Sequence, residues 1–446
     1  MTTMQALRNS VFGGFARVFP SFFGLTEKHD HYSDYGWPKN LEFDHYYRMY
    51  SRNGLATAGV DKTIAKTWES LPELWESEDP AESQIEADIR QRFSKLRFWH
   101  KLMTADRRGM VGEYSGVILV LADGKNFDQP VERVPGNLEG LVKVIPAWQK
   151  QLEVAEWDGN PQSPTYGEPL YFQYNEQDIE GSTSGANRQI RIHPDRVVIW
   201  SEDGTVHCRS TLEPGYNDLI DAEKVKGAGG EGFWKTARGA PIITAPDGMS
   251  AVDVMKMTGT GNTDDMLDKV NEQIDDFAKG FDKGLMLGGL NAEPMTINLP
   301  QPKEFFDIPV MSFAASMNIP IRELIGNETG ERASTEDARK WAQVNMGRRE
   351  NLCLPIIHEI IDRLKMWGIL PNRDWVVGWE SLLDDTPDQR IDRASKMQDI
   401  NSKGQNERPF LPDEIREVAG YEPLSPPEME RNNPDDLGGE DGVVVE

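Results

Sequence analysis

Three of the pairs of adjacent aspartates in this sequence are the side chains that come closest to a catalytic metal site. They are Asp264-Asp265, Asp275-Asp276 and Asp384-Asp385. A two-metal nuclease needs carboxylates that converge on one pocket. The first two pairs fall in a predicted exposed helix and the third in an acidic C-terminal stretch, so nothing in the sequence brings them together. We interpret all three pairs as surface charge.

The histidines and cysteines offer no complete ligand set either. His29 and His31 lie among aromatic and acidic residues that would suit a metal ion, but no second cluster with matching spacing completes four ligands. His193 begins a His-Pro-Asp stretch after a predicted strand, which favours a turn. Two cysteines, Cys208 and Cys353, cannot build a disulfide framework or a structural zinc site. We predict no metal and, from the cysteine count, an intracellular product.

Nucleotide and nucleophile chemistry lacks its signatures as well. The sequence contains no GxxxxGK[ST] stretch, which excludes ATP hydrolysis of the P-loop kind. The stretch Gly259-Thr260-Gly261-Asn262 follows no clear strand, so a flexible loop is the better interpretation. No Ser, Cys or Thr lies in a recognisable nucleophile elbow. We therefore expect no enzyme activity and no cofactor.

The composition limits the partners. The chain has 446 residues, and 48 Lys+Arg against 74 Asp+Glu give a formal charge of −26. Such a surface repels nucleic acid unless positive residues form a patch. The densest basic stretch, residues 90–108, is interpreted as a solvated helix face. An acidic protein can still handle DNA that must slide past without sticking.

Size and hydropathy suggest several soluble units. At roughly 150 residues per domain the length corresponds to about three units. No apolar run reaches the roughly 20 residues that a membrane helix needs. The nearest candidate, residues 11–25, contains Arg17 and Pro20, so a peripheral N-terminal arm is predicted and no membrane partner.

The front half reads as α+β, with helices first and strands after them. Apolar residues at every fourth position predict a helix over about 55–69, and a second pattern predicts one helix over about 81–108. Short apolar runs separated by turn residues predict strands at 117–121, 141–148, 152–157, 170–174, 189–193 and 196–200.

The back half is mainly helical. Helices are predicted over about 216–238, 264–281 and 303–317, an extended segment over 241–248, and a hairpin from 284–288 and 295–299. A long helix follows over about 335–367, with Ser334 and Asp337 as a capping box, a kink at Pro355 and an end at Gly368. Short helices over 390–400 and 412–420 precede an acidic tail beyond residue 423.

Four stretches resemble the portal proteins of tailed bacteriophages, and the order of elements does so over nearly the whole chain. They are Tyr47–Tyr50 leading into 56–68, Arg107-Arg-Gly109 with the following strand, Ile192-His-Pro-Asp-Arg-Val-Val-Ile199, and Ala314–Gly326 followed by Gly330–Asp337. The last is the most specific, because a helix ending in Ile-Pro, a Gly-rich loop and a long kinked helix follow one another in the family. Within the family, the sequence is similar to a branch that shares a domain annotation with phage anti-defence two-histidine phosphodiesterases. That enzyme needs two His-x-Thr/Ser motifs, and only His31 has a Thr or Ser two residues on, at Ser33, so that activity is not carried over.

The resemblance implies a fold with wing, stem, clip and crown. It assigns 1–40 to an N-terminal arm, 41–215 to the wing, 216–238 and 303–318 to two stem helices, 239–302 to the clip, 319–334 to a tunnel loop, 335–368 to a kinked tunnel helix, and 369–446 to a crown with an acidic tail. It implies DNA-channel lining by Asn327, Glu328, Glu331 and Arg332. Hinge positions follow at Pro320, Gly326, Gly330 and Pro355.

The implied function is a homo-oligomeric, twelvefold ring in the virion at one capsid vertex, assembled in the host cytoplasm. Double-stranded DNA would pass through it in packaging and ejection. Its other implied partners are the terminase large subunit, the major capsid or scaffolding protein, and a head-completion adaptor. The stem glycines would allow close packing between subunits, and residues 216–317 would become ordered only against neighbours. Two alternatives remain open from the residues: an anti-defence phosphodiesterase or nuclease, and a scaffolding or tail adaptor protein.

Overall fold

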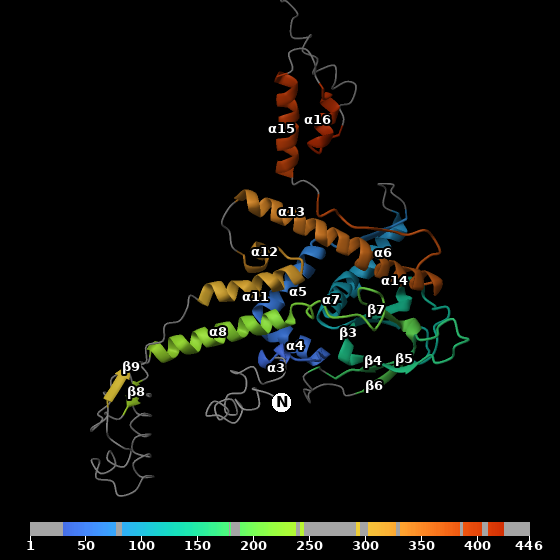
Figure 1. The fold of residues 1–446 in the computed structure, drawn as a ribbon. Coiled ribbons are helices and arrows are strands. Elements are labelled where there is room, and N and C mark those ends of the chain that lie inside the picture. Colours follow the sequence, from blue (N-terminus) through green and yellow to red (C-terminus); the bar gives the residue numbers. More distant parts are fainter. Residues whose placement is uncertain are drawn as a thin grey trace, which may run out of the picture. The chain divides into compact units, whose positions relative to one another are not determined.

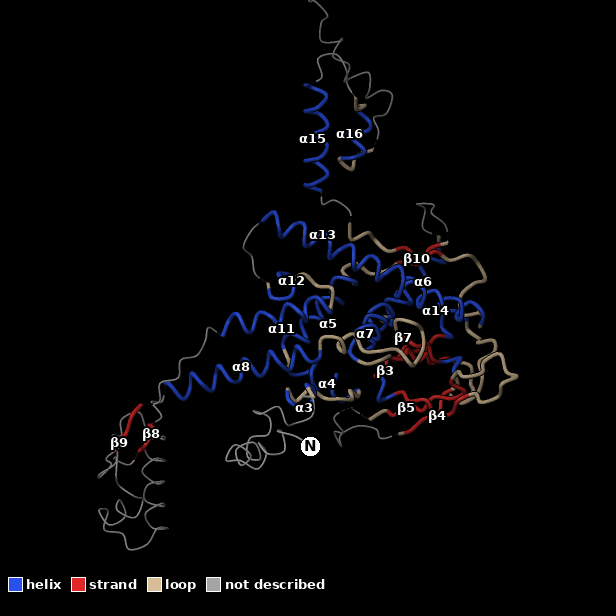
Figure 2. Tube along the Cα trace, viewed as in Figure 1, coloured by secondary structure: helices blue, strands red, loops and turns tan. Residues whose placement is uncertain are grey.

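The computed structural model describes most of the chain as two compact units, residues 1–380 and 381–446 (Figure 1). The described residues are 30–76, 83–177, 179, 188–237, 241–244, 291–294, 302–326, 331–383, 387–403 and 409–422. The first unit contains both helices and strands, while the described part of the second is helical (Figure 2). The length arithmetic suggested about three units, and the contacts divide the chain into two.

The first unit begins with helices. They are α3 (His31–Asp34), α4 (Phe43–Arg52), α5 (Gly54–Thr67), α6 (Gln84–Leu96) and α7 (Phe98–Val111). The Asn53 side chain caps α5, and Ser83 forms a capping box with Glu86 at the start of α6.

The single helix predicted over 81–108 is wrong, because the chain turns at Arg97. This residue has a left-handed backbone with φ +52° and separates α6 from α7. The turn allows Phe93 and Phe98 to stack inside the core, with ring centroids 4.1 Å apart. Neither Gly nor Pro marks the position, so the sequence pattern continued through it.

Two three-stranded antiparallel sheets follow. In the first, β2 (Ser115–Leu121) lies between β3 (Leu141–Trp148) and β7 (Val197–Trp200); in the second, β5 (Pro169–Asn175) lies between β4 (Leu152–Trp157) and β6 (Gln189–Ile192). Ile118 is paired with Ile145 and Val197, which fixes the register of the first sheet. All six predicted strands are confirmed, with bounds that differ by at most two residues. Short 3-10 turns occur at Asn137–Gly140, Gln149–Gln151 and Pro194–Arg196.

The strand β2 serves two cores because its side chains alternate between faces. Val117 and Leu119 face the main core, which contains the helices, whereas Ile118 belongs to a smaller cluster with Leu152 and Phe172 of the second sheet. A two-stranded pairing of β1 (Glu73–Trp75) with β10 (Val376–Gly378) joins an early and a late part of the first unit.

Two long helices leave the main core side by side (Figure 1). They are α8 (Tyr216–Ala237) and α11 (Pro302–Ser316), and the paired strands β8 (Pro241–Thr244) and β9 (Asn291–Pro294) lie between them in sequence. The glycines of α8 do not interrupt it. The predicted helix over 264–281 and the hairpin over 284–299 lie outside the described residues, apart from β9 at Asn291–Pro294.

The inner ends of these helices are ordered by their own chain. Leu219 of α8 and Phe313 of α11 are fully buried in the main core, and the Phe313 ring lies against Gly59, where an added Cβ would come within 3.1 Å of it. The prediction that residues 216–317 become ordered only against neighbours is therefore wrong for these ends.

The remaining helices are α12 (Ile321–Ile325), α13 (Glu331–Arg348), a π-helical turn η4 (Arg349–Cys353) and α14 (Leu354–Met366). In the second unit, α15 (Pro387–Lys403) and α16 (Pro412–Val418) are linked by hydrogen bonds between Asn401 and the backbone of Phe410 at 2.8 and 3.1 Å.

Candidate functional site

The long helix predicted before Gly368 is one helical run over residues 331–366, interrupted by the π turn. The backbone N–H of Leu354 donates to the carbonyl of Arg349, five residues back. Pro355 follows at the second position of α14, where it has no N–H to donate and where its ring would crowd a regular preceding turn. The wider π turn accommodates the proline without ending the helix. Gly368, with φ +77°, follows the end of α14 as predicted.

A buried carboxylate holds this turn against the rest of the unit. Asp106 of α7 is fully buried and accepts hydrogen bonds from the indole N–H groups of Trp68 at 2.8 Å and Trp200 at 2.9 Å. Both terminal nitrogens of Arg348 also donate to it, one at 2.7 Å. Four N–H donors from three segments far apart in the sequence therefore converge on one carboxylate, which fixes the end of α13.

The charge state of this cluster follows from its contacts. Burial by itself disfavours the charged form of Arg348, but the Asp106 carboxylate outweighs burial and raises the pKa of the arginine above its ordinary value. Burial raises the pKa of the Cys353 thiol well above its ordinary value, and the charge of Asp106 adds to this rise. The cluster is thus an ion pair beside a neutral thiol.

The next arginine fixes the π turn itself. Arg349 is 1% exposed, and it donates from Nε to the Thr67 carbonyl at 2.6 Å and from Nη1 to the Glu380 carbonyl at 2.6 Å. Its guanidinium lies 4.4 Å from the centre of the Trp379 ring. Burial lowers its pKa to about 10, so it stays charged at neutral pH. We call Asp106, Arg348 and Arg349 the helix anchor.

The C-terminal half of the helix has its own attachment. Arg363 of α14 donates from Nη1 to the carbonyls of Pro194, Asp195 and Val197 at 2.9, 2.7 and 2.8 Å. Those carbonyls belong to the turn before β7, where the His193 side chain accepts from the Asp195 N–H. The turn predicted at His193 is confirmed, and its carbonyls bind the Arg363 side chain and so attach α14.

The predicted tunnel loop 319–334 is largely helical. Pro320 is the N-cap of α12, Gly326 ends that helix with φ +82°, and the Gly326 N–H donates to the Arg322 carbonyl at 2.7 Å. Lys62 of α5 donates to the carbonyl of Glu323 at 2.6 Å and so fixes α12 to the core. Five residues, 326–330, lie between α12 and α13 in sequence.

The capping box at Ser334 is wrong, because α13 already begins at Glu331. Glu, Arg and Ala at 331–333 are better helix formers than the residues before them, and they extend the helix through the serine. Of the predicted channel residues, Asn327 and Glu328 lie outside the described residues, as does the hinge residue Gly330. Glu331 and Arg332 are the first two residues of α13, and their side chains are not described. The lining by these four residues therefore stays a prediction.

The sequence of residues 45–403 matches the family model of the phage portal protein. That range covers most of the chain and both stretches that carry the anchor. The chain belongs to the phage portal protein family. No curated protein matches it.

Solved structures similar to this chain include chains of gene transfer agent (GTA) particles and a phage portal protein. A chain from "Neck of empty GTA particle" aligns with a TM-score of 0.48 and 13% identity, covering 86% of this chain and 95% of that one. A chain from a virion of a native gene transfer agent particle gives 0.48 and 12%, with the same coverage. The HK97 family phage portal protein from Corynebacterium diphtheriae gives 0.41 and 11%, covering 74% and 95%.

Family membership makes this a phage portal protein with a structural role, and it is not an enzyme. It removes both alternatives left open by the residues. Within the described ranges, no three His, Cys, Asp or Glu side chains are grouped so that they could hold a metal ion. None of the helices in that part of the chain is long and apolar enough to cross a membrane.

The portal protein also carries an uncovered apolar face on α11. Phe305, Ile308 and Met311, spaced three residues apart, are 56%, 66% and 56% exposed, while Val310 and Phe313 on the opposite face are buried. On α8, an added Cβ at Gly227 or Gly230 would meet nothing within 4 Å. We call the first set the stem stripe and the two glycines the stem glycine face.

Sequence reasoning missed the anchor and the stem stripe. The Arg348-Arg349 pair lies between α13 and the apolar stripe of α14, and two cations beside so apolar a surface signal a buried acid partner. That acid is 242 residues away, and a single sequence cannot indicate which of its 74 acids it is.

Proposed function

We propose that the protein forms a twelvefold ring at one capsid vertex, through which double-stranded DNA passes in packaging and ejection. In this proposal the helices and sheets of 41–215 form the wing, α8 and α11 the stem, 239–302 the clip, and 331–366 the kinked tunnel helix. The second unit forms the crown. Family membership supports the function, and the stem stripe is the observation that carries the assembly.

The stem stripe needs a cover that its own chain does not supply. Fully burying a side chain such as Phe, Ile or Met contributes about 1.5–3 kcal/mol, so three exposed ones on one helix face form a substantial binding surface. The stem glycine face offers backbone to close approach. A head-to-tail contact, in which the stripe of one subunit packs on the glycine face of the next, uses two different surfaces and closes into a ring when the rotation fits.

The proposed channel rests on charge and on the short connection between α12 and α13. A charge of −26 lets DNA slide because few phosphates find a cation. Asn327, Glu328, Glu331 and Arg332 are the proposed lining. Gly326 and Gly330 frame the connection and let it follow the DNA, while Pro320 and Pro355 set the directions of the flanking helices.

The same proposal places the protein in the virion, after assembly in the host cytoplasm. The clip would bind the terminase large subunit during packaging and the head-completion adaptor afterwards. The wing would contact the major capsid or scaffolding protein.

Ring assembly tests the proposal most directly. Purified protein should contain rings with a central hole by negative-stain electron microscopy, together with a matching mass by light scattering. The double variant Ile308→Asp, Met311→Asp should raise the concentration needed for assembly by at least tenfold, because it places two carboxylates in the apolar contact.

The matched control is Val142→Asp on β3, which is also an exposed apolar residue. It should assemble like the parent, and both variants should keep the parent's thermal midpoint. Parent protein that stays monomeric at high concentration, or a double variant that assembles normally, would refute the stem contact.

A deletion of residues 327–329 tests the channel. Rings should still form, since the anchor and the stem stripe are intact, but DNA packaged or retained per particle should fall. Normal packaging and retention by intact mutant particles would remove this connection from the mechanism.

A further inference from the structure

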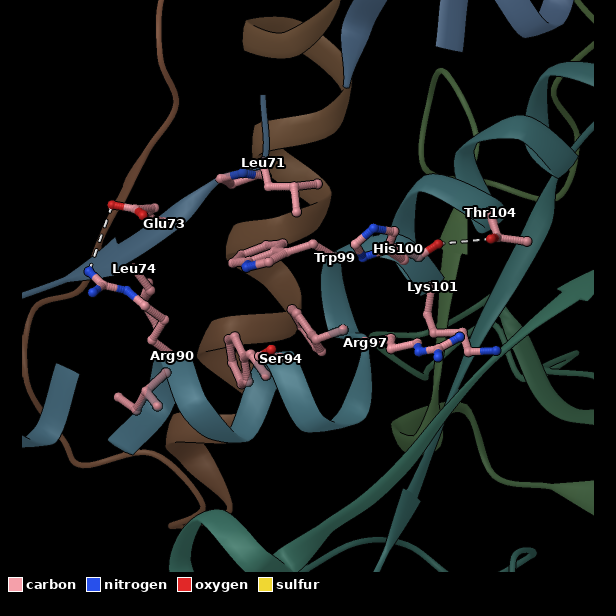
Figure 3. A pocket seen from close by; sticks show the side chains of 14 residues that line it. Leu71, Glu73, Leu74, Arg90, Ser94, Arg97, Trp99, His100, Lys101 and Thr104 are labelled. Carbon is pink, nitrogen blue, oxygen red and sulfur yellow. Dashed lines mark hydrogen bonds and ion pairs between the residues drawn. The ribbon is translucent and has the colours of Figure 1, made fainter. Parts of the chain in front are cut away.

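A cavity of about 650 Å³ lies at the corner between α6 and α7, beside β1 (Figure 3). Its floor is apolar and comes from Leu74, Ile89, Phe93 and Phe98, all of which are also core residues. Trp99 extends this surface toward the opening. Its volume is in the range of pockets that hold a ligand or an inserted side chain.

The rim of the cavity is positively charged although the chain as a whole is strongly acidic. The cations that line it are Arg90, Arg97 and Lys101, and Glu73 is the one acidic residue among the lining residues. The Glu73 carboxylate oxygen Oε2 lies 3.9 Å from Nη2 of Arg90 and forms an ion pair with it. Neither Arg97 nor Lys101 has an ion-pair partner within the part of the chain that the structure describes.

Arg97 and Lys101 lie where their charges are unfavourable for the fold. Arg97 and Lys101 are one helical turn apart, so their like charges repel. Both lie at the N-terminal end of α7, where the helix dipole favours anions, yet the first turn of α7 has no acidic residue and Arg97 makes no side-chain cap. An anion in the cavity would reverse all of these unfavourable interactions.

The backbone at Arg97 supports the same conclusion. With φ +52°, it adopts a conformation that glycine takes at no steric cost and that other residues rarely adopt. An arginine at this corner brings its side chain to the rim beside Lys101 (Figure 3). The residue that adopts the unfavourable backbone conformation is therefore also one of the cations at the rim.

We propose that this cavity binds an acidic segment of a partner protein, which inserts one bulky apolar side chain onto the floor and pairs its carboxylates with Arg97 and Lys101. The apolar floor favours a peptide over a nucleic acid, because phosphates would use the rim and leave the floor uncovered. The proposal goes beyond DNA passage and requires neither the ring nor the channel.

Unbiased selection tests the chemistry of the partner. A random linear peptide library displayed on phage is panned against the full-length protein, and enriched peptides are synthesised with a fluorescent label for anisotropy titration. The expected consensus has one or two large apolar residues flanked by several Asp or Glu. Affinity should fall at least tenfold for Arg97→Glu, Lys101→Glu, and should also fall when salt is raised.

Two further variants separate loss of peptide binding from misfolding and from a general change of charge. Arg97→Gly suits the left-handed backbone, so it should fold at least as well as the parent while weakening the peptide. Arg52→Glu with Lys143→Glu makes the same charge change on exposed residues outside the cavity and should bind like the parent.

Three results would overturn the proposal. They are no enrichment, a consensus without acidic residues, and equal peptide affinity in the parent and both Arg97 variants. A 20-base-pair DNA duplex is titrated in parallel. Duplex binding that depends on Arg97 and is stronger than peptide binding would assign the rim to nucleic acid instead.

Discussion

The helix anchor and the stem stripe solve opposite problems within one subunit. At the anchor, polar groups are buried and each finds a partner from the same chain, as Asp106 does with four N–H donors. On α11, apolar groups are exposed and find none among the described residues. The first arrangement fixes one conformation of the subunit. The second leaves apolar surface whose burial can stabilise a contact with a neighbouring subunit. Substitutions at the two regions should therefore separate stability from assembly.

Removing the anchor's charge should have the largest effect. Asp106→Asn leaves the largely buried Arg348 guanidinium, whose side chain is 15% exposed, without a counter-charge, which should lower the free energy of unfolding by about 3–5 kcal/mol. Urea denaturation followed by tryptophan fluorescence measures it, since Trp68 and Trp200 both contact the carboxylate. Asp88→Asn, on the exposed side of α6, is the control and should change stability by less than about 0.5 kcal/mol. Similar decreases in the free energy of unfolding for the two variants would contradict the stabilising role of the anchor.

A smaller effect is expected one contact away. The Thr67 hydroxyl donates to Asn345 at 2.9 Å, and both residues are buried. Thr67→Val keeps the shape but strands the Asn345 oxygen, so unfolding should become easier by about 1–3 kcal/mol.

The control for this variant is Thr104→Val. The Thr104 hydroxyl donates only to the His100 carbonyl within its own helix. Equal effects of the two valines in the same denaturation assay would contradict the account.

The smallest effect has the opposite sign and comes from the stem. Gly227→Ala adds a methyl group where nothing lies within 4 Å and should stabilise the isolated subunit by about 0.5–1 kcal/mol through helix propensity. If the glycine face receives a neighbour, the same change should weaken ring assembly measured by light scattering.

Gly204→Ala is the matched comparison for the stem glycine. It also has free space, but its φ of +73° makes alanine unfavourable, so it should destabilise the subunit by about 1 kcal/mol and leave assembly unchanged. A Gly227 variant that is both more stable and fully competent in assembly would exclude close packing at this face.

Local patterns predicted most of the fold, because its elements follow from neighbouring residues. The bounds of β3 and β4 agree with the predicted strands, and α8 agrees to within one residue in spite of its glycines. Failures occurred where tertiary packing overrides the pattern. Arg97 turns left-handed because Phe93 and Phe98 must stack, and Ser334 lies inside a helix that propensity extends past it.

The site was predictable only in part. Proline and glycine punctuation indicated the turn at Gly326 and an irregular helix near Pro355, which the π turn now explains in physical terms. The anchor could not be derived, since it joins residues from distant segments whose side chains give no sign of the pairing before the fold exists. The channel residues remain a proposal.

The pairing of β1 with β10 has a consequence for synthesis. Trp75 pairs with Val376, so the β1–β10 pairing cannot form until roughly 300 further residues have left the ribosome. At typical elongation rates this takes about 15–60 s. During that interval the apolar faces of α5 and α6 have no completed core to cover them. We therefore expect nascent chains of this protein to need chaperone protection for most of their synthesis, and subunits to become competent for assembly only near the end of translation.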